Sequence, residues 1–419
     1  MLRAYYPRII DEQISRRLES IGAVVIEGAR ATGKTVTGEH HAKSVVRVDH
    51  EIERQPLVRE HPETLIEGDA PRLFDEWQVL PQLWNQVRRE VDRRQQFGQF
   101  LLTGSAIPQD DITRHSGAGR FARVRMRPLS LYETMRPSSY VSMKRLLQGD
   151  AHVAGRATLD LRSLVDVMVR GGWPALLAGT TDGVQWVRDY IDETTRVDLT
   201  TIGTSGRSRD PEKIARVLRS LARSPSSEIR VRRVMQDSFG VESGLARNTI
   251  ENYLDALRRI MLLEDVPAWQ PHLRSSTELR TSPKSYFVDP SIGPAILRLT
   301  TDHLLGDLNY VGQLFENLVM RDVLVYAQAN DAKVSFYRDS TGLEIDAIIE
   351  GQDAAWIAVE IKLGSTSADA AAASMQRFVK RVDTGRMGPP ASLIVITGGG
   401  YAITRSDGVH IVPIELLGP

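Results

Sequence analysis

A glycine-rich segment near the N-terminus carries the residues whose types and spacing best fit a defined chemistry. Residues 28–35 read Gly-Ala-Arg-Ala-Thr-Gly-Lys-Thr and fit the pattern G-x-x-x-x-G-K-[ST]. The apolar run 21–26 predicts a buried strand before the segment, and a helix is expected to start near Val36, which is the context that a phosphate-binding P-loop requires. Such a loop turns backbone N–H groups toward a phosphate chain, and the helix N-terminus favours its negative charge. The predicted nucleotide-binding residues are Gly28, Ala29, Arg30, Ala31, Thr32, Gly33, Lys34 and Thr35.

The chemistry predicted for this loop is ATP hydrolysis with Mg²⁺. Lys34 is expected to reach the β- and γ-phosphates of ATP, and the Thr35 hydroxyl is expected to bind Mg²⁺. Residues 73–76, Leu-Phe-Asp-Glu, predict the end of another strand. Asp75 would help to hold the hydrated Mg²⁺, and Glu76 would act as the general base on the attacking water. The alternative for Asp75 and Glu76 is an acidic surface pair at the start of a helix.

Two further segments place polar groups where they could complete such a site. The predicted strand 97–105 ends in Thr103-Gly-Ser105, so either hydroxyl could sense the γ-phosphate, although an ordinary turn explains the pair nearly as well. Arginines then alternate in residues 114–128. A run of charge is usually a solvated face, but one of these arginines could act as an arginine finger in the active site of a neighbouring subunit.

Composition sets limits on the class of protein. The 419 residues are 42% hydrophobic and 25% charged, with a net charge of zero and no cysteine. These values are typical of a globular protein, they exclude disulfides and thiolate zinc sites, and they require any DNA binding to come from local patches of charge. No secretory signal and no apolar run of the roughly 18–20 residues that span a bilayer are visible. We therefore expect a cytoplasmic protein that does not contact membranes.

The middle of the chain predicts a winged helix over residues 211–290. Helices are expected at 214–221, 231–239 and 246–259, with a turn at Gly240 and Gly244, followed by wing strands at 262–266 and 285–288. The third helix could enter a major groove, and nearby arginines could contact phosphates. The alternative is a module that serves only for packing. The predicted DNA-binding residues are Arg232, Arg233, Arg247 and Arg258.

Upstream of that region, residues 186–199 predict a helix. Its Arg196 could reach a nucleotide as a second sensor, but a structural ion pair is the favoured interpretation.

Acidic residues near the C-terminus predict a second constellation. The strand 355–362 should place Glu360 and Lys362 on one face, because side chains repeat every two residues, and a hairpin would bring Asp346 beside them. Together with Glu316 on a preceding helix, these residues resemble the core of PD-(D/E)xK nucleases, in which carboxylates bind Mg²⁺ and the lysine assists the water. The alternatives are a solvent-facing Glu-x-Lys pair that arises by chance and a nuclease-like domain that binds DNA without cutting it.

Taken together, the motifs resemble the AAA-type P-loop ATPases of bacteria and archaea that carry a C-terminal domain of unknown function, DUF4143. The resemblance implies that Arg120 is the best candidate for the arginine finger. The sequence departs from the family pattern at Trp77 and at His115-Ser-Gly-Ala. The motifs that carry the resemblance are the P-loop, Phe74-Asp75-Glu76-Trp77-Gln78, Leu102-Thr-Gly-Ser105, Gly119-Arg120, residues 127–133 and Arg170-Gly-Gly-Trp-Pro174.

The expected fold is α/β. A P-loop AAA-type ATPase domain is predicted over residues 1–150, a helical and winged-helix region over 151–300, and a PD-(D/E)xK nuclease-like α/β domain over 301–419. The expected function is that of a homo-oligomeric ring that hydrolyses ATP and remodels DNA, with forks or Holliday junctions as candidate substrates. One alternative is an ATP-dependent and metal-dependent DNA endonuclease. Another is a nucleotide-gated switch that binds a protein partner.

Overall fold

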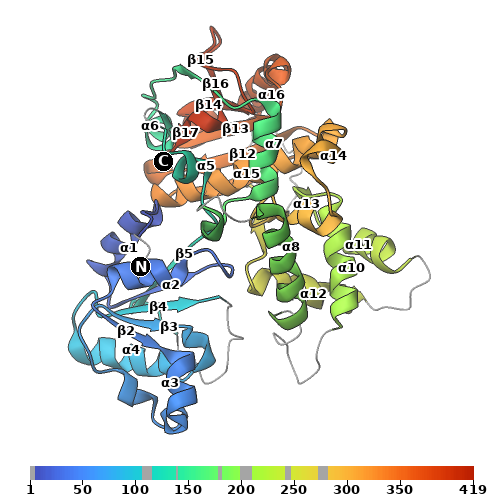
Figure 1. The fold of residues 1–419 in the computed structure, drawn as a ribbon. Helices are drawn as coiled ribbons and strands as arrows, with labels where there is room; N and C mark the ends of the chain where they lie inside the picture. Colours follow the sequence, from blue (N-terminus) through green and yellow to red (C-terminus); the bar gives the residue numbers. More distant parts are fainter. Residues whose placement is uncertain are drawn as a thin grey trace. The chain divides into compact units, whose positions relative to one another are not determined.

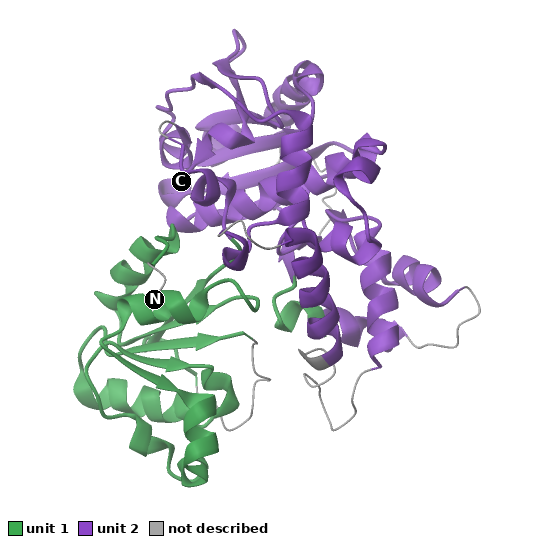
Figure 2. Ribbon diagram, in the orientation of Figure 1, with its two compact units in different colours: residues 1–128, 204–206, 256–262 green, residues 129–203, 207–255, 263–419 purple. Residues whose placement is uncertain are grey.

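A computed structural model describes residues 5–105, 116–137, 140–177, 182–198, 210–240, 247–271 and 282–419. The chain divides into two compact units, of which the first is mainly residues 1–128 and the second mainly residues 129–419 (Figure 2). Arg114 and His115 of the arginine-rich segment and Gly244 of the predicted turn lie outside the described residues. The division into three domains stays a prediction. No helix of the described ranges is long and apolar enough to cross a membrane.

The first unit is built on a five-stranded parallel sheet with the strand order β2-β3-β4-β1-β5 (Figure 1). A parallel sheet needs helical crossovers between its strands, so the chain alternates between strand and helix. Short 3₁₀ segments at Pro56–Arg59, Pro62–Leu65 and Trp77–Val79 join some of the elements. The elements are α1 (Ile10–Leu18), β1 (Ala23–Glu27), α2 (Lys34–His41), β2 (Ser44–Arg47), α3 (Val48–Arg54), β3 (Arg72–Asp75), α4 (Leu83–Arg94), β4 (Phe100–Gly104) and β5 (Phe121–Arg125).

The central strand β1 shows why this sheet is buried on both faces. Ala23 and Val25 belong to one hydrophobic cluster, whereas the alternate residues Val24 and Ile26 belong to another. A continuous apolar run is what a parallel strand covered on both sides requires. The carboxyl ends of β1, β3 and β4 therefore meet at one edge of the sheet, which is the edge where α/β proteins bind ligands.

The second unit contains a seven-stranded mixed sheet with the order β11-β12-β13-β14-β16-β15-β7. On β13, Trp356 and Ala358 pack in a cluster with Phe378 of α16, while the alternate residues Ile357 and Val359 are also fully buried. Both faces are therefore covered, and α15 packs against β11 and β13. The elements are α15 (Leu308–Ala329), β11 (Lys333–Arg338), β12 (Glu344–Glu350), β13 (Trp356–Lys362), α16 (Ala368–Arg381), α17 (Thr384–Met387), β14 (Ser392–Thr397), β15 (Tyr401–Thr404) and β16 (Val409–Pro413).

Helices and a small antiparallel sheet precede this mixed sheet in the chain. The small sheet has the order β8-β10-β9, and the short strand β8 between α10 and α11 was not predicted. Short strands of the second unit are β6 (Val141–Ser142) and β17 (Leu417–Gly418), which pair with each other, and β7 (Gly155–Arg156), which belongs to the seven-stranded sheet. The other elements are α5 (Leu131–Met135), α6 (Met143–Gln148), α7 (Leu161–Arg170), α8 (Gly183–Glu193), α10 (Pro211–Ala222), β8 (Ser227–Glu228), α11 (Val231–Phe239), α12 (Arg247–Arg259), β9 (Leu263–Val266), β10 (Lys284–Phe287), α13 (Ile292–Leu297) and α14 (Thr301–Leu305).

Candidate functional sites

The predicted P-loop connects β1 directly to α2 at the ligand-binding edge of the first sheet. Gly33 has a φ of 96° and immediately precedes α2, a conformation that glycine adopts without steric cost. At Gly28, an added Cβ would lie 2.1 Å from the backbone oxygen of Met126, so the close approach of two backbone segments excludes a side chain there. These two glycines explain the spacing of the motif: one allows the close approach and the other allows the turn into the helix.

Lys34 points into this loop. Its Nζ donates a hydrogen bond of 2.7 Å to the carbonyl oxygen of Ala29, and the side chain is buried. Burial lowers the pKa of the ammonium to about 8, although the carboxylates of Glu76 and Asp75 oppose this change. A buried cation with one neutral acceptor is suited to bind an anionic phosphate.

Thr35, Asp75 and Thr103 meet beside the loop. The Thr35 Oγ1 donates to Asp75 Oδ1 at 2.9 Å, and the Thr103 Oγ1 donates to the same oxygen at 2.5 Å. The second contact follows from the sheet register, in which Asp75 of β3 is paired with Thr103 of β4. The Thr35 hydroxyl at the start of α2 and the Asp75 carboxylate at the end of β3 are hard oxygen ligands, so these residues fit a Mg²⁺ ion bound together with phosphates.

Glu76 lies next to Asp75 at the end of β3. It has a φ of 53°, which is rare for a residue with a side chain and is often found at functional sites. Its Oε2 accepts hydrogen bonds from the Gln78 amide and, at 3.3 Å, from the Ser105 hydroxyl. The carboxylate is thus held by two donors at the edge that carries the P-loop.

Sequence reasoning missed two supports of this site. Gln78 was noted only as part of a motif, but its amide orients Glu76. Arg8 is buried and donates hydrogen bonds of 2.9 Å to the carbonyl oxygens of Thr32 and Arg127, so it fixes the loop. The proline and tyrosines around Arg8 gave no signal of this role.

The candidate arginine finger has a partner within its own chain. Arg120 Nε lies 2.8 Å from Asp92 Oδ1, and its side chain is 43% exposed. Arg123 forms an ion pair with Glu27. Arg196, considered as a second sensor, lies 2.8 Å from Glu193 in a π-helical segment, Thr194–Asp198, that follows α8. This ion pair is the structural arrangement that the sequence favoured for Arg196.

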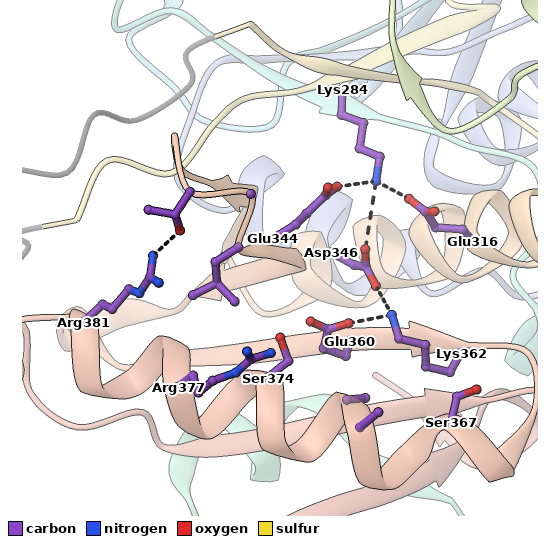
Figure 3. A pocket seen from close by; sticks show the side chains of 15 residues that line it. Lys284, Glu316, Glu344, Asp346, Glu360, Lys362, Ser367, Ser374, Arg377 and Arg381 are labelled. Carbon is purple, nitrogen blue, oxygen red and sulfur yellow. Dashed lines mark hydrogen bonds and ion pairs between the residues drawn. The ribbon is translucent and has the colours of Figure 1, made fainter.

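The four predicted nuclease-like residues line one pocket of about 760 Å³ in the second unit (Figure 3). Lys362 Nζ lies 2.6 Å from Glu360 Oε2 and 3.5 Å from Asp346 Oδ2, and the same Asp346 oxygen accepts a hydrogen bond of 2.8 Å from the Ile361 N–H. Glu316 reaches the pocket from α15. The structure therefore brings together residues that the sequence placed on a helix, on the strand 355–362 and across a hairpin from that strand.

Lys284, at the start of β10, was not predicted to belong to this pocket. Its Nζ lies 2.7 Å from Glu316 Oε1, 3.1 Å from Glu344 Oε1 and 4.0 Å from Asp346 Oδ1. Figure 3 shows the ammonium pointing into the group of carboxylates. The one signal available in the sequence was a lysine at the start of a strand that is otherwise apolar or small.

The resemblance to PD-(D/E)xK nucleases implies a metal ion here, and the residues present do not fit it. In the ranges that the structure describes, no group of three or more His, Cys, Asp or Glu is arranged to hold a metal. The ammonium of Lys284 lies instead among the carboxylates that would have to supply the ligands. No chemical step that requires a metal is therefore assigned to this pocket.

The environment of the pocket raises the pKa of two of its carboxyl groups. Burial raises the pKa of Glu316 and of Glu360 to about 7, with Asp346 adding to both shifts, while Lys284 opposes the shift at Glu316 and Lys362 opposes it at Glu360. Four carboxylates, those of Glu316, Glu344, Asp346 and Glu360, share the two ammonium groups of Lys284 and Lys362, so part of the negative charge is suppressed near neutral pH.

The predicted DNA-binding arginines lie on two helices. Arg232 and Arg233 are exposed on α11, and Arg247 is exposed at the start of α12. Arg233 lies 3.8 Å from Asp237, and Arg247 lies 2.8 Å from Glu251. Arg258 is half-buried near the end of α12. The first three are accessible to a phosphate, whereas Arg258 is less so.

Comparisons with known proteins define the class of both ends of the chain. Residues 20–135 match the family described as an AAA domain, and residues 311–417 match a domain of unknown function, DUF4143. Residues 161–303 match another domain of unknown function, DUF8612, which the sequence analysis did not identify. The protein thus has a P-loop ATPase domain of the AAA type at its N-terminal end and a DUF4143 domain at its C-terminal end, which confirms the predicted resemblance.

Individual relatives give no further assignment. An uncharacterized protein of Mycobacterium bovis and one of Mycobacterium tuberculosis are each 23% identical over 409 residues, which cover 96% of this chain and 82% of theirs. Among solved structures, a Walker-type ATPase of Pyrococcus abyssi matches at 11% identity with a TM-score of 0.43, covering 71% of this chain and 97% of that one. A DNA replication initiation factor matches at 12% identity with a TM-score of 0.26, covering 60% of this chain and 87% of that one.

Proposed function

We propose that this AAA-type P-loop ATPase hydrolyses ATP with Mg²⁺ and uses the reaction to act on DNA. The observation that carries the hydrolytic part is the meeting of the P-loop with Asp75 and Glu76 at one edge of the sheet. Lys34 is buried in the loop, Thr35 contacts Asp75 at 2.9 Å, and Glu76 is held by Gln78 and Ser105.

Each of these residues has a separate task in hydrolysis. The loop N–H groups and Lys34 bind the phosphates and offset the negative charge that develops on them. Thr35 and Asp75 would hold Mg²⁺, which when bound neutralises charge on the β- and γ-phosphate oxygens. Glu76 accepts a proton from the attacking water, and Ser105 and Gln78 keep its carboxylate oriented for that step.

The DNA-directed part of the proposal is supported by local charge in the second unit. The whole chain is neutral, yet residues 210–240 contain seven Lys and Arg against four Asp and Glu. Within that range, Arg216, Arg219, Arg223, Arg230 and Arg232 are exposed. Such a concentration of guanidinium groups is the electrostatic footprint of a phosphate-binding surface.

The order of elements in this region also supports the proposal. Along the chain, α10, β8, α11, α12, β9 and β10 follow one another, and the three strands form one antiparallel sheet. This is the order of helices and strands in a winged helix, a fold that places a helix against a DNA groove. We propose forks and four-way junctions as candidate substrates.

We further propose that subunits form a ring in which Arg120 of one subunit completes the site of the next. Its side chain is partly exposed and is held by the Asp92 carboxylate and by a hydrogen bond of 3.1 Å to the carbonyl oxygen of Ala118. A surface ion pair of this kind contributes little stability, so the arginine can exchange Asp92 for a phosphate.

The test is the rate of ATP hydrolysis with and without single-stranded, duplex, forked and four-way-junction DNA. We expect Lys34→Ala to abolish hydrolysis, and Glu76→Gln to bind nucleotide but to lower kcat by about 10²–10⁴-fold. A Glu76→Gln protein that hydrolyses ATP at the wild-type rate would refute the assignment of the base.

The DNA arms of the same experiment test the second half of the proposal. Stimulation by branched DNA that exceeds stimulation by duplex would support remodelling of branched substrates. If no DNA changes the rate or binds, the DNA proposal fails while the hydrolytic assignment stands, and a nucleotide-gated switch with a protein partner becomes the better interpretation.

A further inference from the structure

The acidic pocket of the second unit receives a cation from a different sheet. Lys284 belongs to β10 of the small sheet, whereas its partners belong to α15 and β12. The lysine is only 7% exposed, and its ammonium lies within 4.0 Å of Glu316, Glu344 and Asp346. A buried lysine is normally costly, so this arrangement requires the carboxylates to compensate its charge.

We propose that Lys284 is the resident cation of this pocket and takes the place that a divalent metal would occupy. The ammonium contacts carboxylate oxygens that come from separate elements, which are the oxygens that a divalent metal would use as ligands. A divalent ion bound by Glu316 Oε1, Glu344 Oε1 and Asp346 Oδ1 would have to occupy the volume that the Lys284 ammonium fills. Lys362 does not compete for that position, because it contacts the other oxygen of Asp346, Oδ2, and Glu360. The pocket of this DUF4143 domain therefore does not bind Mg²⁺ or Mn²⁺ and does not cleave DNA by a metal-dependent reaction.

The lysine also joins two sheets. A second cation, Arg338 of β11, lies 3.2 Å from Glu228 of β8 and 3.7 Å from Glu344 of β12. Cations and carboxylates thus alternate from the small sheet into the seven-stranded sheet, and Lys284 is the central cation of the series. We infer that this network orients the small sheet, which carries the proposed DNA-binding helices, on the nuclease-like sheet.

A prediction about metal binding follows from the same geometry. Without the ammonium, Glu316 Oε1, Glu344 Oε1 and Asp346 Oδ1 lose the cation that they share, while the Tyr286 hydroxyl still donates to Glu316 Oε1 at 2.9 Å. With Glu360 nearby, these carboxylates form a set of hard ligands that suits a divalent cation. Replacement of Lys284 by a neutral side chain of similar length should therefore create a metal site that the native protein lacks. The inference does not depend on the proposed action on DNA, because metal binding is measured without DNA or nucleotide.

The experiment measures Mn²⁺ binding to the full chain by electron paramagnetic resonance of the free ion. All proteins carry Thr35→Ala, which removes the hydroxyl proposed to bind metal at the P-loop. We expect no site with a dissociation constant below about 1 mM, and no effect of Asp346→Asn, while Lys284 is present. Adding Lys284→Met should create one site, and adding Asp346→Asn to that protein should abolish it. The matched control Lys380→Met, at an exposed lysine of α16, should create none.

Two results would overturn the proposal. One is a Mn²⁺ ion bound in the presence of Lys284 and lost on Asp346→Asn, because that ion would occupy the pocket beside the lysine. The other is a Lys284→Met protein that folds, as judged by circular dichroism, yet gains no site. If Lys284→Met does not fold, two proteins that retain Lys284 can still be compared, one with Asp346 and one with Asp346→Asn. Their Mn²⁺ binding decides whether the native pocket holds a metal.

Discussion

At the scale of single residues, Lys34 is the group whose charge state should govern nucleotide binding. Its pKa is lowered to about 8 by burial, so the ammonium loses its proton just above neutral pH. Bound phosphates would favour the charged form and raise this pKa. Affinity for ATP should therefore be constant up to about pH 8 and weaken above it, approaching a tenfold loss per pH unit. The reason is that protonating Lys34 on binding then costs about 1.4 kcal/mol more for each pH unit.

Fluorescence titration with a labelled ATP analogue between pH 7 and pH 9.5 measures this dependence. Lys34→Ala serves as the control: it should bind weakly at every pH and show no break near pH 8. An affinity of the native protein that does not change over this interval would show that Lys34 stays charged in the free enzyme.

Glu360 should make the free energy of unfolding depend on pH between about 4.5 and 7. Its pKa is raised to about 7 by burial and by Asp346, with Lys362 opposing. A carboxyl whose pKa is higher in the folded protein stabilises the fold below its unfolded pKa, near 4.5, and this contribution is lost as pH rises to about 7. Glu360→Gln should match the native protein at pH 4 and be more stable by about 1–3 kcal/mol at pH 8.

Urea unfolding of the two proteins at both pH values tests this expectation. Glu350→Gln, at the far end of β12, is the control. Its free energy of unfolding should change between the two pH values by the same amount as that of the native protein. A Glu360→Gln protein that is less stable than the native one at pH 8 would show that the ion pair with Lys362 outweighs the cost of burial.

At the scale of elements, a buried group of charges explains a motif that the sequence offered only as a resemblance. In Arg170-Gly-Gly-Trp-Pro174, the N–H of Gly172 donates to Asp289 at 2.9 Å, and an added Cβ at Gly172 would lie 2.1 Å from the Leu129 oxygen. Arg321 of α15 lies 2.9 Å from Asp289 and 2.7 Å from Asp322. Arg321 thus connects helix α15, through Asp289, to the segment before α13 and to the turn after α7.

Removing that arginine should be far more damaging than removing an exposed one. Arg321→Met would leave Asp289 and Asp322 buried without a cation, which typically costs about 3–5 kcal/mol. Arg386→Met removes an arginine that is 72% exposed and should cost less than about 1 kcal/mol. Denaturant unfolding of both variants checks the contrast. A loss below about 1 kcal/mol for Arg321→Met would mean that water reaches the two carboxylates.

The same elements show what the sequence could and could not predict. Strands and helices with a strong local pattern were predicted to within a few residues, as for α11, because burial of one face dictates the spacing of apolar residues. The strand predicted over residues 97–105 is shorter, Phe100–Gly104, and Gly98 before it has a φ of 65°, which lies outside the extended region. Lys284 escaped prediction because its role arises from β10 lying beside α15 and β12, a tertiary arrangement that no local pattern encodes.

At the scale of the whole molecule, neutrality determines how DNA binding would have to work. With equal numbers of acidic and basic residues, the chain has no global field that attracts nucleic acid, so affinity must come from local groups of exposed arginines, such as those of α11 and α12. Binding of this kind releases counterions from the DNA and weakens with salt in proportion to the number of phosphates contacted.

We therefore expect the triple variant Arg232→Ala, Arg233→Ala and Arg247→Ala to bind DNA weakly and to lose DNA stimulation of the ATPase. If each arginine contacts one phosphate, the slope of log K against log salt should fall by about 2.7 on duplex DNA, since each contact contributes about 0.9. Fluorescence anisotropy over a series of salt concentrations measures this slope. A control that removes Arg54, Arg93 and Arg386, which are also exposed, changes the net charge equally. If both variants reduce binding by the same amount, the effect is one of total charge and the surface on α11 and α12 is not the DNA site.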